Sequence, residues 1–146
     1  DLKAKKMKRY YFERFYGWWK LEAIDDASMP EEKTLQEDFY TFYERFANDS
    51  VFQRSRVVDP LPFVAPDPDD DFQMLETTIG KEQWFSFQPK LPQDVLTNIN
   101  YGQRLEKNSR TRIIELRGFG NGFNNTLYFK CRNGEWKLTR FEDMGN

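Results

Sequence analysis

An acidic run at residues 67–71 carries the spacing that comes nearest to a metal site in this 146-residue chain. Asp67, Asp69 and Asp71 match the first, third and fifth positions of a calcium-binding loop, where carboxylate oxygens are ligands. The sixth position, which requires glycine, is Phe72, and the twelfth, which requires a bidentate glutamate, is Thr78. We therefore interpret the run as a solvated acidic loop with three weak candidate ligands, and we predict no tight metal site.

General acid–base chemistry has few candidate residues, because the chain contains no histidine. Histidine is the commonest general base and the commonest transition-metal ligand in proteins. What remains is a carboxylate base with a tyrosine donor, namely Asp38 or Glu44 with Tyr40 or Tyr43. These residues fit a solvated helix face equally well. We assign no catalytic residue and expect no cofactor.

Aromatic residues also gather between residues 81 and 101, where no regular period dictates their packing. Trp84 offers an apolar face with one N–H, and Tyr101 offers a hydroxyl, which is the mixture that concave binding sites favour. We predict a ligand pocket around Trp84, Phe87 and Tyr101, with Tyr43 on a facing helix. The alternative is that these side chains seal the core.

The composition argues against a nucleic-acid partner and against a transmembrane segment. The net charge is −2, whereas a nucleic-acid-binding face must be basic to neutralise phosphates. No apolar run approaches the ~20 residues needed for a transmembrane helix.

Cys131 is the single cysteine, so no internal disulfide can form. The length and the aromatic content of 17% suit one domain with a substantial core.

The candidate residues lie on elements that follow from hydrophobic periodicity. Leu35, Phe39, Phe42 and Phe46 predict a helix that ends near Asn48, with Thr34 and Glu37 as a capping box. We expect a second short helix, capped by Asp49 or Ser50 and ending before Asp59-Pro60, then an extended proline-rich segment. A strand at 72–79, a helical turn at 80–87 and a β region from 110 to 143 follow. Helices followed by antiparallel strands indicate an α+β domain.

The two ends of the chain resemble each other. Shifting Tyr11–Ser28 by 117 positions aligns it with the C-terminus at seven identities in eighteen positions. The identities include a turn glycine, Gly17 on Gly134, and a strand tryptophan, Trp19 on Trp136. We interpret residues 1–28 as the terminal β-hairpin of a preceding related repeat and residues 29–146 as one cone-like domain. Shared aromatic composition of two unrelated hairpins is the alternative.

Three segments together resemble the family called domain of unknown function 4348. They are "FYTFYERFANDSVFQRSRVVDPLPF", "DPDDDFQMLETTIGKEQWFSFQPKLP" and "GFGNGFNNTLYFKCRNGEWKLTRFED", and the resemblance spans residues from about 35 to 146. The most specific pieces are F-x-x-D-x-x-F-Q-x-x-R and the final Gly-x-Trp-Lys-Leu. The resemblance implies a nuclear transport factor 2-like cone, in which N-terminal helices pack on a curved antiparallel sheet. It supplies no catalytic residues.

The resemblance also implies a Bacteroides-type protein of the periplasm or cell envelope, often a lipoprotein. The chain opens without methionine, so we expect the native N-terminus upstream, where a lipid anchor would attach. We expect a non-catalytic binding module for a small ligand or an envelope protein. The alternatives are an isomerase- or lyase-like enzyme with a carboxylate/tyrosine pocket, and a structural repeat unit of an envelope assembly.

Overall fold

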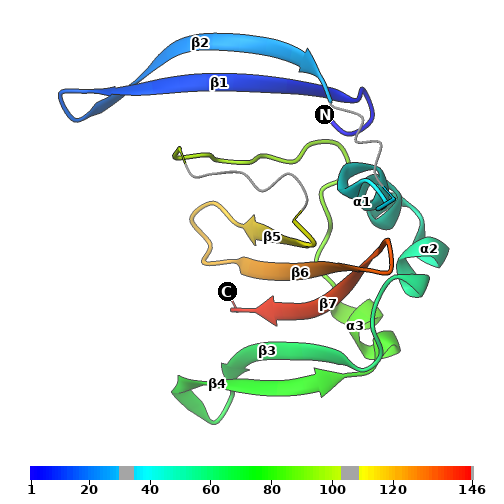
Figure 1. Ribbon diagram of the computed structural model, residues 1–146. Helices are drawn as coiled ribbons and strands as arrows, with labels where there is room; N and C mark the ends of the chain where they lie inside the picture. Colours follow the sequence, from blue (N-terminus) through cyan, green and yellow to red (C-terminus); the bar gives the residue numbers. More distant parts are fainter. Residues whose placement is uncertain (30–34, 103–108, 146) are drawn as a thin grey trace.

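The computed structural model describes residues 1–29, 35–102 and 109–145, and for Asp71 the backbone only. Figure 1 shows two parts, a long hairpin and an α+β domain. The described residues form seven strands and three α-helices, which in chain order are β1 (Lys6–Phe15), β2 (Trp18–Ser28), α1 (Phe39–Asn48), α2 (Ser50–Ser55), β3 (Leu61–Asp67), β4 (Asp70–Ile79), α3 (Lys81–Phe87), β5 (Thr111–Arg117), β6 (Asn124–Arg132) and β7 (Glu135–Asp143).

The main sheet has five strands in the order β4-β3-β7-β6-β5. Neighbouring strands are antiparallel except β3 and β7, which run parallel and pair Phe63 with Phe141. This parallel pair differs from a simple meander. It arises because the chain leaves β4 through α3 and a long connection to begin β5 at the other edge. The hairpins β5–β6 and β6–β7 then bring β7 back beside β3 (Figure 1).

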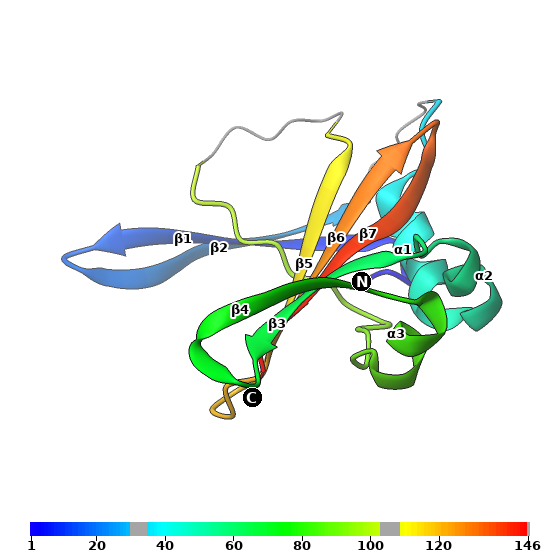
Figure 2. The same cartoon turned by 90° about the horizontal axis from the view of Figure 1, so that it is seen from below.

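The helices lie together at one end of the sheet, and they cover only one of its faces (Figures 1 and 2). Alternate residues of β6 and β7 point to this face and form the core, because successive side chains of a strand point to opposite sides. Leu127 and Phe129 of β6 and Trp136 and Leu138 of β7 are fully buried. The opposite face carries Tyr128 and Arg140 at a paired position.

Helix α1 begins four residues later than the sequence pattern suggested. Asp38 is its N-cap and accepts a hydrogen bond from the Thr41 N–H at 2.8 Å. Leu35 is fully exposed and lies outside the helix, whereas Thr34 falls outside the described residues. The predicted capping box is wrong for Glu37 because its carboxylate is used in a tertiary contact. The other helix limits, at Asn48 and at the Asp49 cap of α2, are confirmed.

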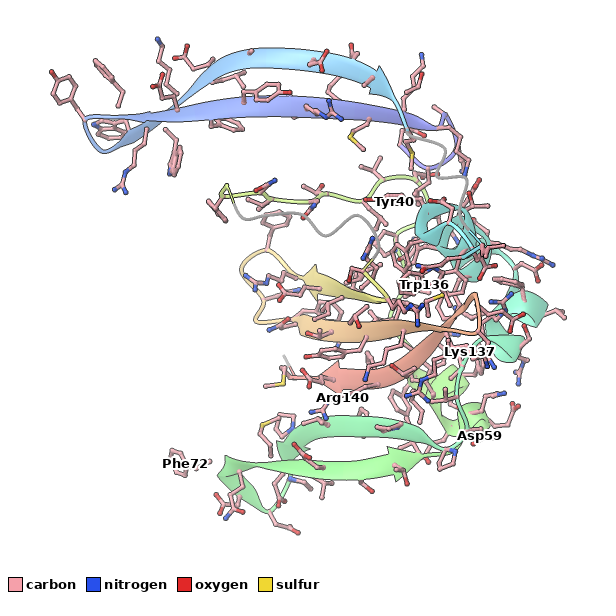
Figure 3. All side chains as sticks on the ribbon, in the orientation of Figure 1. Tyr40, Asp59, Phe72, Trp136, Lys137 and Arg140 are labelled. Carbon is pink, nitrogen blue, oxygen red and sulfur yellow. The ribbon has the colours of Figure 1, made fainter. Side chains whose placement is uncertain are left out.

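That tertiary contact is a partly buried ion pair, which we call the Arg56 staple; it consists of Glu37, Arg56 and Trp136. The Glu37 carboxylate receives Arg56 Nη1 at 2.8 Å and Nη2 at 3.3 Å, and it also accepts the Trp136 backbone N–H. Trp136 Nε1 donates to the Glu37 carbonyl at 2.7 Å, and Figure 3 shows Trp136 near α1. The staple therefore fastens the start of α1 and the end of α2 to the β6–β7 hairpin.

The N-terminal hairpin β1–β2 is confirmed, and it turns at Tyr16-Gly17 as predicted. Its base is tied to the domain by a hydrogen bond from the Leu2 N–H to the Asp94 carbonyl at 2.8 Å. From there it extends away from the five-stranded sheet as a separate two-stranded ribbon (Figure 2).

Candidate functional site

Helix α1 lays a broad aromatic surface on the sheet. The rings of Phe39, Phe42 and Phe46 have their centroids 5.6, 5.7 and 5.3 Å from that of Phe129 in β6. The fourth ring, Tyr43, is also fully buried, and its centroid lies 6.1 Å from that of Phe129. The predicted Phe stripe is therefore confirmed, and Tyr43 belongs to the same buried face.

Helix α3 places Trp84 in the same interior. The helix has no side-chain cap of its own, but Asp59, just before the adjacent strand β3, accepts the Lys81 N–H at 3.2 Å. Trp84 is fully buried, and its ring lies 6.5 Å from Phe46 and 6.3 Å from Phe141. The residue thus sits between α1 and the sheet rather than at the surface.

Two polar atoms in this aromatic interior lack a hydrogen-bond partner among the described residues. They are the Tyr43 hydroxyl and Trp84 Nε1, both on fully buried side chains. Burying a polar group without a partner costs about 1–3 kcal/mol, so such groups are rare in native proteins. Burial also raises the pKa of the Tyr43 phenol far above its ordinary value. The phenol therefore stays protonated and can act as a hydrogen-bond donor, but not as a base.

The four predicted pocket residues do not share one environment. Tyr43 and Trp84 lie inside, whereas Tyr101 is 77% exposed. Phe87 lies between these extremes: it is 42% exposed, and its ring packs on Phe63 at 5.6 Å and Phe141 at 6.4 Å. Trp84 and Phe87 therefore both contact Phe141, whereas Tyr101 lies on the surface.

The candidate carboxylate–tyrosine pairs are engaged elsewhere. Asp38 caps α1, and Glu44 forms an ion pair with Lys5 at 2.8 Å. Tyr40 is partly buried and packs against the core, and Figure 3 shows it on α1. Among the described hydrogen bonds, neither carboxylate accepts from Tyr40 or Tyr43.

Sequence reasoning missed two polar pairs on β6 and β7. On the outer face the Tyr128 hydroxyl donates to Glu142 at 2.9 Å, and Arg140 Nε donates to the same carboxylate at 2.9 Å. On the helix-covered face the buried Asn125 donates from Nδ2 to Asp143 at 2.8 Å. Strand alternation gives the face of each residue, but the partners are 14 and 18 positions apart, so pairing required the register.

We expect opposite stability effects from removing the two tyrosine hydroxyls. Tyr43→Phe should raise the free energy of unfolding by about 1 kcal/mol, because it removes a buried group without a partner. Tyr128→Phe is the matched control and should lower it by about 0.5–1 kcal/mol, because a hydrogen bond to a carboxylate is lost. Urea denaturation of both variants measures the difference. A loss of stability in Tyr43→Phe would show that its hydroxyl is bonded in the folded protein.

The acidic run forms the turn between β3 and β4. The Asp67 carboxylate accepts the Asp69 N–H at 2.9 Å, and Phe72, at the sixth loop position, projects from the tip of the hairpin (Figure 3). No group of three or more potential ligands comes together in the described part of the chain, which excludes the Asp71 side chain.

We expect calorimetric titration of the protein with calcium to give no micromolar binding. The twelfth position of the loop, Thr78, lies in β4 and has no carboxylate for a bidentate contact. Micromolar binding that is lost in Asp69→Asn would contradict this expectation, and Asp26→Asn, which alters an acidic residue of β2, is a suitable control.

The architecture is that of the nuclear transport factor 2-like (NTF2-like) proteins. The crystal structure of an NTF2-like protein from Bacteroides fragilis matches the chain with a TM-score of 0.92 and 49% sequence identity. The match covers 99% of this chain and 62% of that chain, so the protein described here spans less than two thirds of its relative's length. The expected α+β cone fold is confirmed.

A family model, Domain of unknown function (DUF4348), matches residues 1–143, and the chain belongs to this family. The resemblance inferred from residues 35–146 is confirmed, and it extends through the N-terminal hairpin. No curated protein shows significant similarity to the chain. No helix in the described ranges is both long and apolar enough to cross a membrane. The NTF2-like fold contains enzymes and non-enzymes, so it does not assign a reaction.

Proposed function

We propose that this protein is a non-catalytic module that binds a small ligand with an apolar body and a hydrogen-bond acceptor. The observation that supports this proposal is the pair of buried donors, Tyr43 Oη and Trp84 Nε1, set in an aromatic interior without partners among the described residues. A carbonyl, ether or carboxylate oxygen would satisfy either donor, and the surrounding rings would cover the apolar part.

Access to this interior requires a local movement, because Tyr43 and Trp84 have no exposed surface. Helix α3 is the element suited to move. It has seven residues, its N-terminus is held by the Asp59 side chain, and Arg54 forms an exposed ion pair with Glu82 on its outer side. Trp84 is the one buried residue of this short helix, and local opening of one such element costs less free energy than global unfolding.

An isomerase- or lyase-like enzyme is the alternative class, and the geometry gives it less support. Such chemistry would need a carboxylate next to the donor tyrosine. Asp38 and Glu44 are occupied by the α1 cap and by Lys5, and the raised pKa of Tyr43 removes the phenolate as a base. A structural repeat unit is the third candidate. Failure of every tested ligand to bind would favour it.

The ligand proposal is tested by titration with 2-naphthoate, which combines a fused aromatic body with a carboxylate. We expect it to raise the melting temperature and change the tryptophan fluorescence, because a ligand that binds only the folded state stabilises it. Tyr43→Phe should weaken binding about 5–10-fold, the equivalent of about 1–1.4 kcal/mol for one hydrogen bond. Trp84→Phe should act similarly.

The matched control for these variants is Tyr101→Phe, because Tyr101 is largely exposed and should leave binding unchanged. The proposal fails if neither naphthoate nor any compound released from an envelope extract binds the protein. It also fails if the Tyr43 and Trp84 variants bind as well as the parent protein.

We further propose that the protein acts in the periplasm or cell envelope as one unit of a lipid-anchored chain, in line with the Bacteroides-type family that it resembles. Fractionation of the source cells, with detection by an antibody, tests this location. Recovery in the cytoplasmic fraction would contradict it.

A further inference from the structure

The hairpins β1–β2 and β6–β7 have the same register, residue for residue. All eight pairs of β6–β7 recur in β1–β2 at positions 117 lower. The register shift also recurs, between Tyr11 and Phe12 in one hairpin and between Tyr128 and Phe129 in the other. A bulge is a specific local feature, so this agreement goes beyond shared aromatic composition.

The two turns agree as well. Tyr16 and Gly17 have φ values of 46° and 85°, and Asn133 and Gly134 have 52° and 81°. Positive φ at both central residues defines the type I′ turn of a two-residue hairpin. Asparagine adopts this conformation readily, whereas tyrosine does so rarely, so the hairpin geometry is retained where the turn residue is unfavourable.

The two hairpins differ in what covers them. The core face of β6–β7 is buried under α1, whereas the equivalent side chains of β1–β2 are aromatic or aliphatic and 45–60% exposed, except at Arg14. A contiguous exposed apolar surface of this kind marks an interaction site, and an isolated two-stranded hairpin is marginally stable in water. We call these side chains the open face; they are Tyr10, Phe12, Trp19, Leu21 and Ile24.

The surroundings of the turns show the same difference. A Cβ at Gly134 would lie 3.1 Å from the Leu35 carbonyl, because the segment before α1 crosses that turn. At Gly17 no atom lies within 4 Å of the equivalent position. In addition, β6 and β7 have β5 and β3 at their outer edges, whereas β1 and β2 pair only with each other among the described strands. Within residues 1–29, 35–102 and 109–145, the hairpin therefore has no covering helix, no crossing segment and no flanking strands.

We propose that β1–β2 forms the two central strands of a second NTF2-like domain, and that a domain of the same fold on its N-terminal side covers the open face. That domain would supply a helix with an aromatic stripe like that of α1. It would also place one strand beside β1, as β5 lies beside β6, and one parallel strand beside Ile24, as β3 lies beside Phe141. The Bacteroides fragilis relative is longer than this chain, which covers 62% of it, so it has residues beyond the matched region.

A second copy of this chain is a weaker occupant. Its α1 already covers its own β6–β7, with Phe39, Phe42 and Phe46 fully or almost fully buried, so it has no free aromatic helix to offer. Next to the open face, Arg14 stands opposite Trp19 where β6–β7 has the buried Cys131, so the partner must accommodate a cation at that position.

The experiment compares residues 1–146 with the chain extended through the sequence encoded before Asp1. Amide hydrogen exchange of β1–β2 is measured in both proteins. We expect rapid exchange in residues 1–146 and at least about 100-fold slower exchange in the extended protein, because docked strands open only with their domain. Trp19→Ala should remove this protection in the extended protein and leave β6–β7 unaffected. Trp136→Ala, its positional equivalent, should remove the protection of β6–β7 and leave that of β1–β2 unaffected.

Several results would overturn the proposal. One is rapid exchange of β1–β2 in the extended protein, or protection that Trp19→Ala does not change. Another is the absence of an encoded domain before Asp1. A doubled mass of residues 1–146 by light scattering, returning to the monomer value in Phe12→Asp, would show that a second copy covers the open face instead.

Discussion

Phe129→Ala should lower the free energy of unfolding by about 3–5 kcal/mol, as expected for deleting a fully buried aromatic ring. Phe129 is the ring on which α1 packs, since it contacts Phe39, Phe42, Tyr43 and Phe46. Its removal would leave a cavity between helix and sheet that the remaining rings fill only partly. Urea denaturation, followed by circular dichroism, measures the loss.

Phe12→Ala is the matched control, because Phe12 has the same strand position in β1–β2 but is 57% exposed. The same substitution there should change global stability by no more than about 0.5 kcal/mol. Equal losses at both positions would mean that the hairpin is already part of the domain core. A small loss at Phe129 would contradict the packing described for α1.

Arg56→Ala should lower the free energy of unfolding by about 2–3 kcal/mol. The substitution leaves the Glu37 carboxylate with the Trp136 N–H as its described partner, and removing one member of an ion pair that is largely withdrawn from water is destabilising. The guanidinium also lies 4.7 Å from the Phe52 ring centroid, so packing is lost together with charge. We place the loss below the usual 3–5 kcal/mol for such pairs because the Glu37 side chain is 27% exposed.

Arg54→Ala is the control for this prediction, because Arg54 pairs with Glu82 at the surface. Exposed ion pairs contribute about 0–1 kcal/mol, so the loss should stay within that range. Arg56→Lys should lie between the two alanine variants, since lysine keeps the charge but not the two-pronged contact with Glu37. The staple would be disproved as a stability determinant if Arg56→Ala and Arg54→Ala had equal effects.

The Arg56 staple also explains the sequence motif F-x-x-D-x-x-F-Q-x-x-R in structural terms. Phe46 and Phe52 are buried on the two helices, and Asp49 caps α2 by accepting two backbone N–H groups at 3.0 Å. Arg56 ends the motif at the ion pair with Glu37. The motif therefore joins α1, α2 and the sheet.

The sequence alone determined those features that depend on neighbours within a few positions. The 3–4 spacing of Phe39, Phe42 and Phe46 located α1, and the glycine turns at Gly17 and Gly134 located both hairpins. Asp49 identified the α2 cap. Each of these patterns has a local cause, which is a helical period, a positive φ value or an unsatisfied N–H group.

Only the tertiary structure decided which distant groups meet. Glu37 forms an ion pair with Arg56 and does not cap the helix. Tyr128 meets Glu142, and β3 lies parallel to β7. The tertiary structure also left the Tyr43 hydroxyl buried without a described partner, although a helix-face tyrosine can equally face solvent. These contacts depend on the register between strands and on the order of the strands in the sheet. Local periodicity contains no information about either.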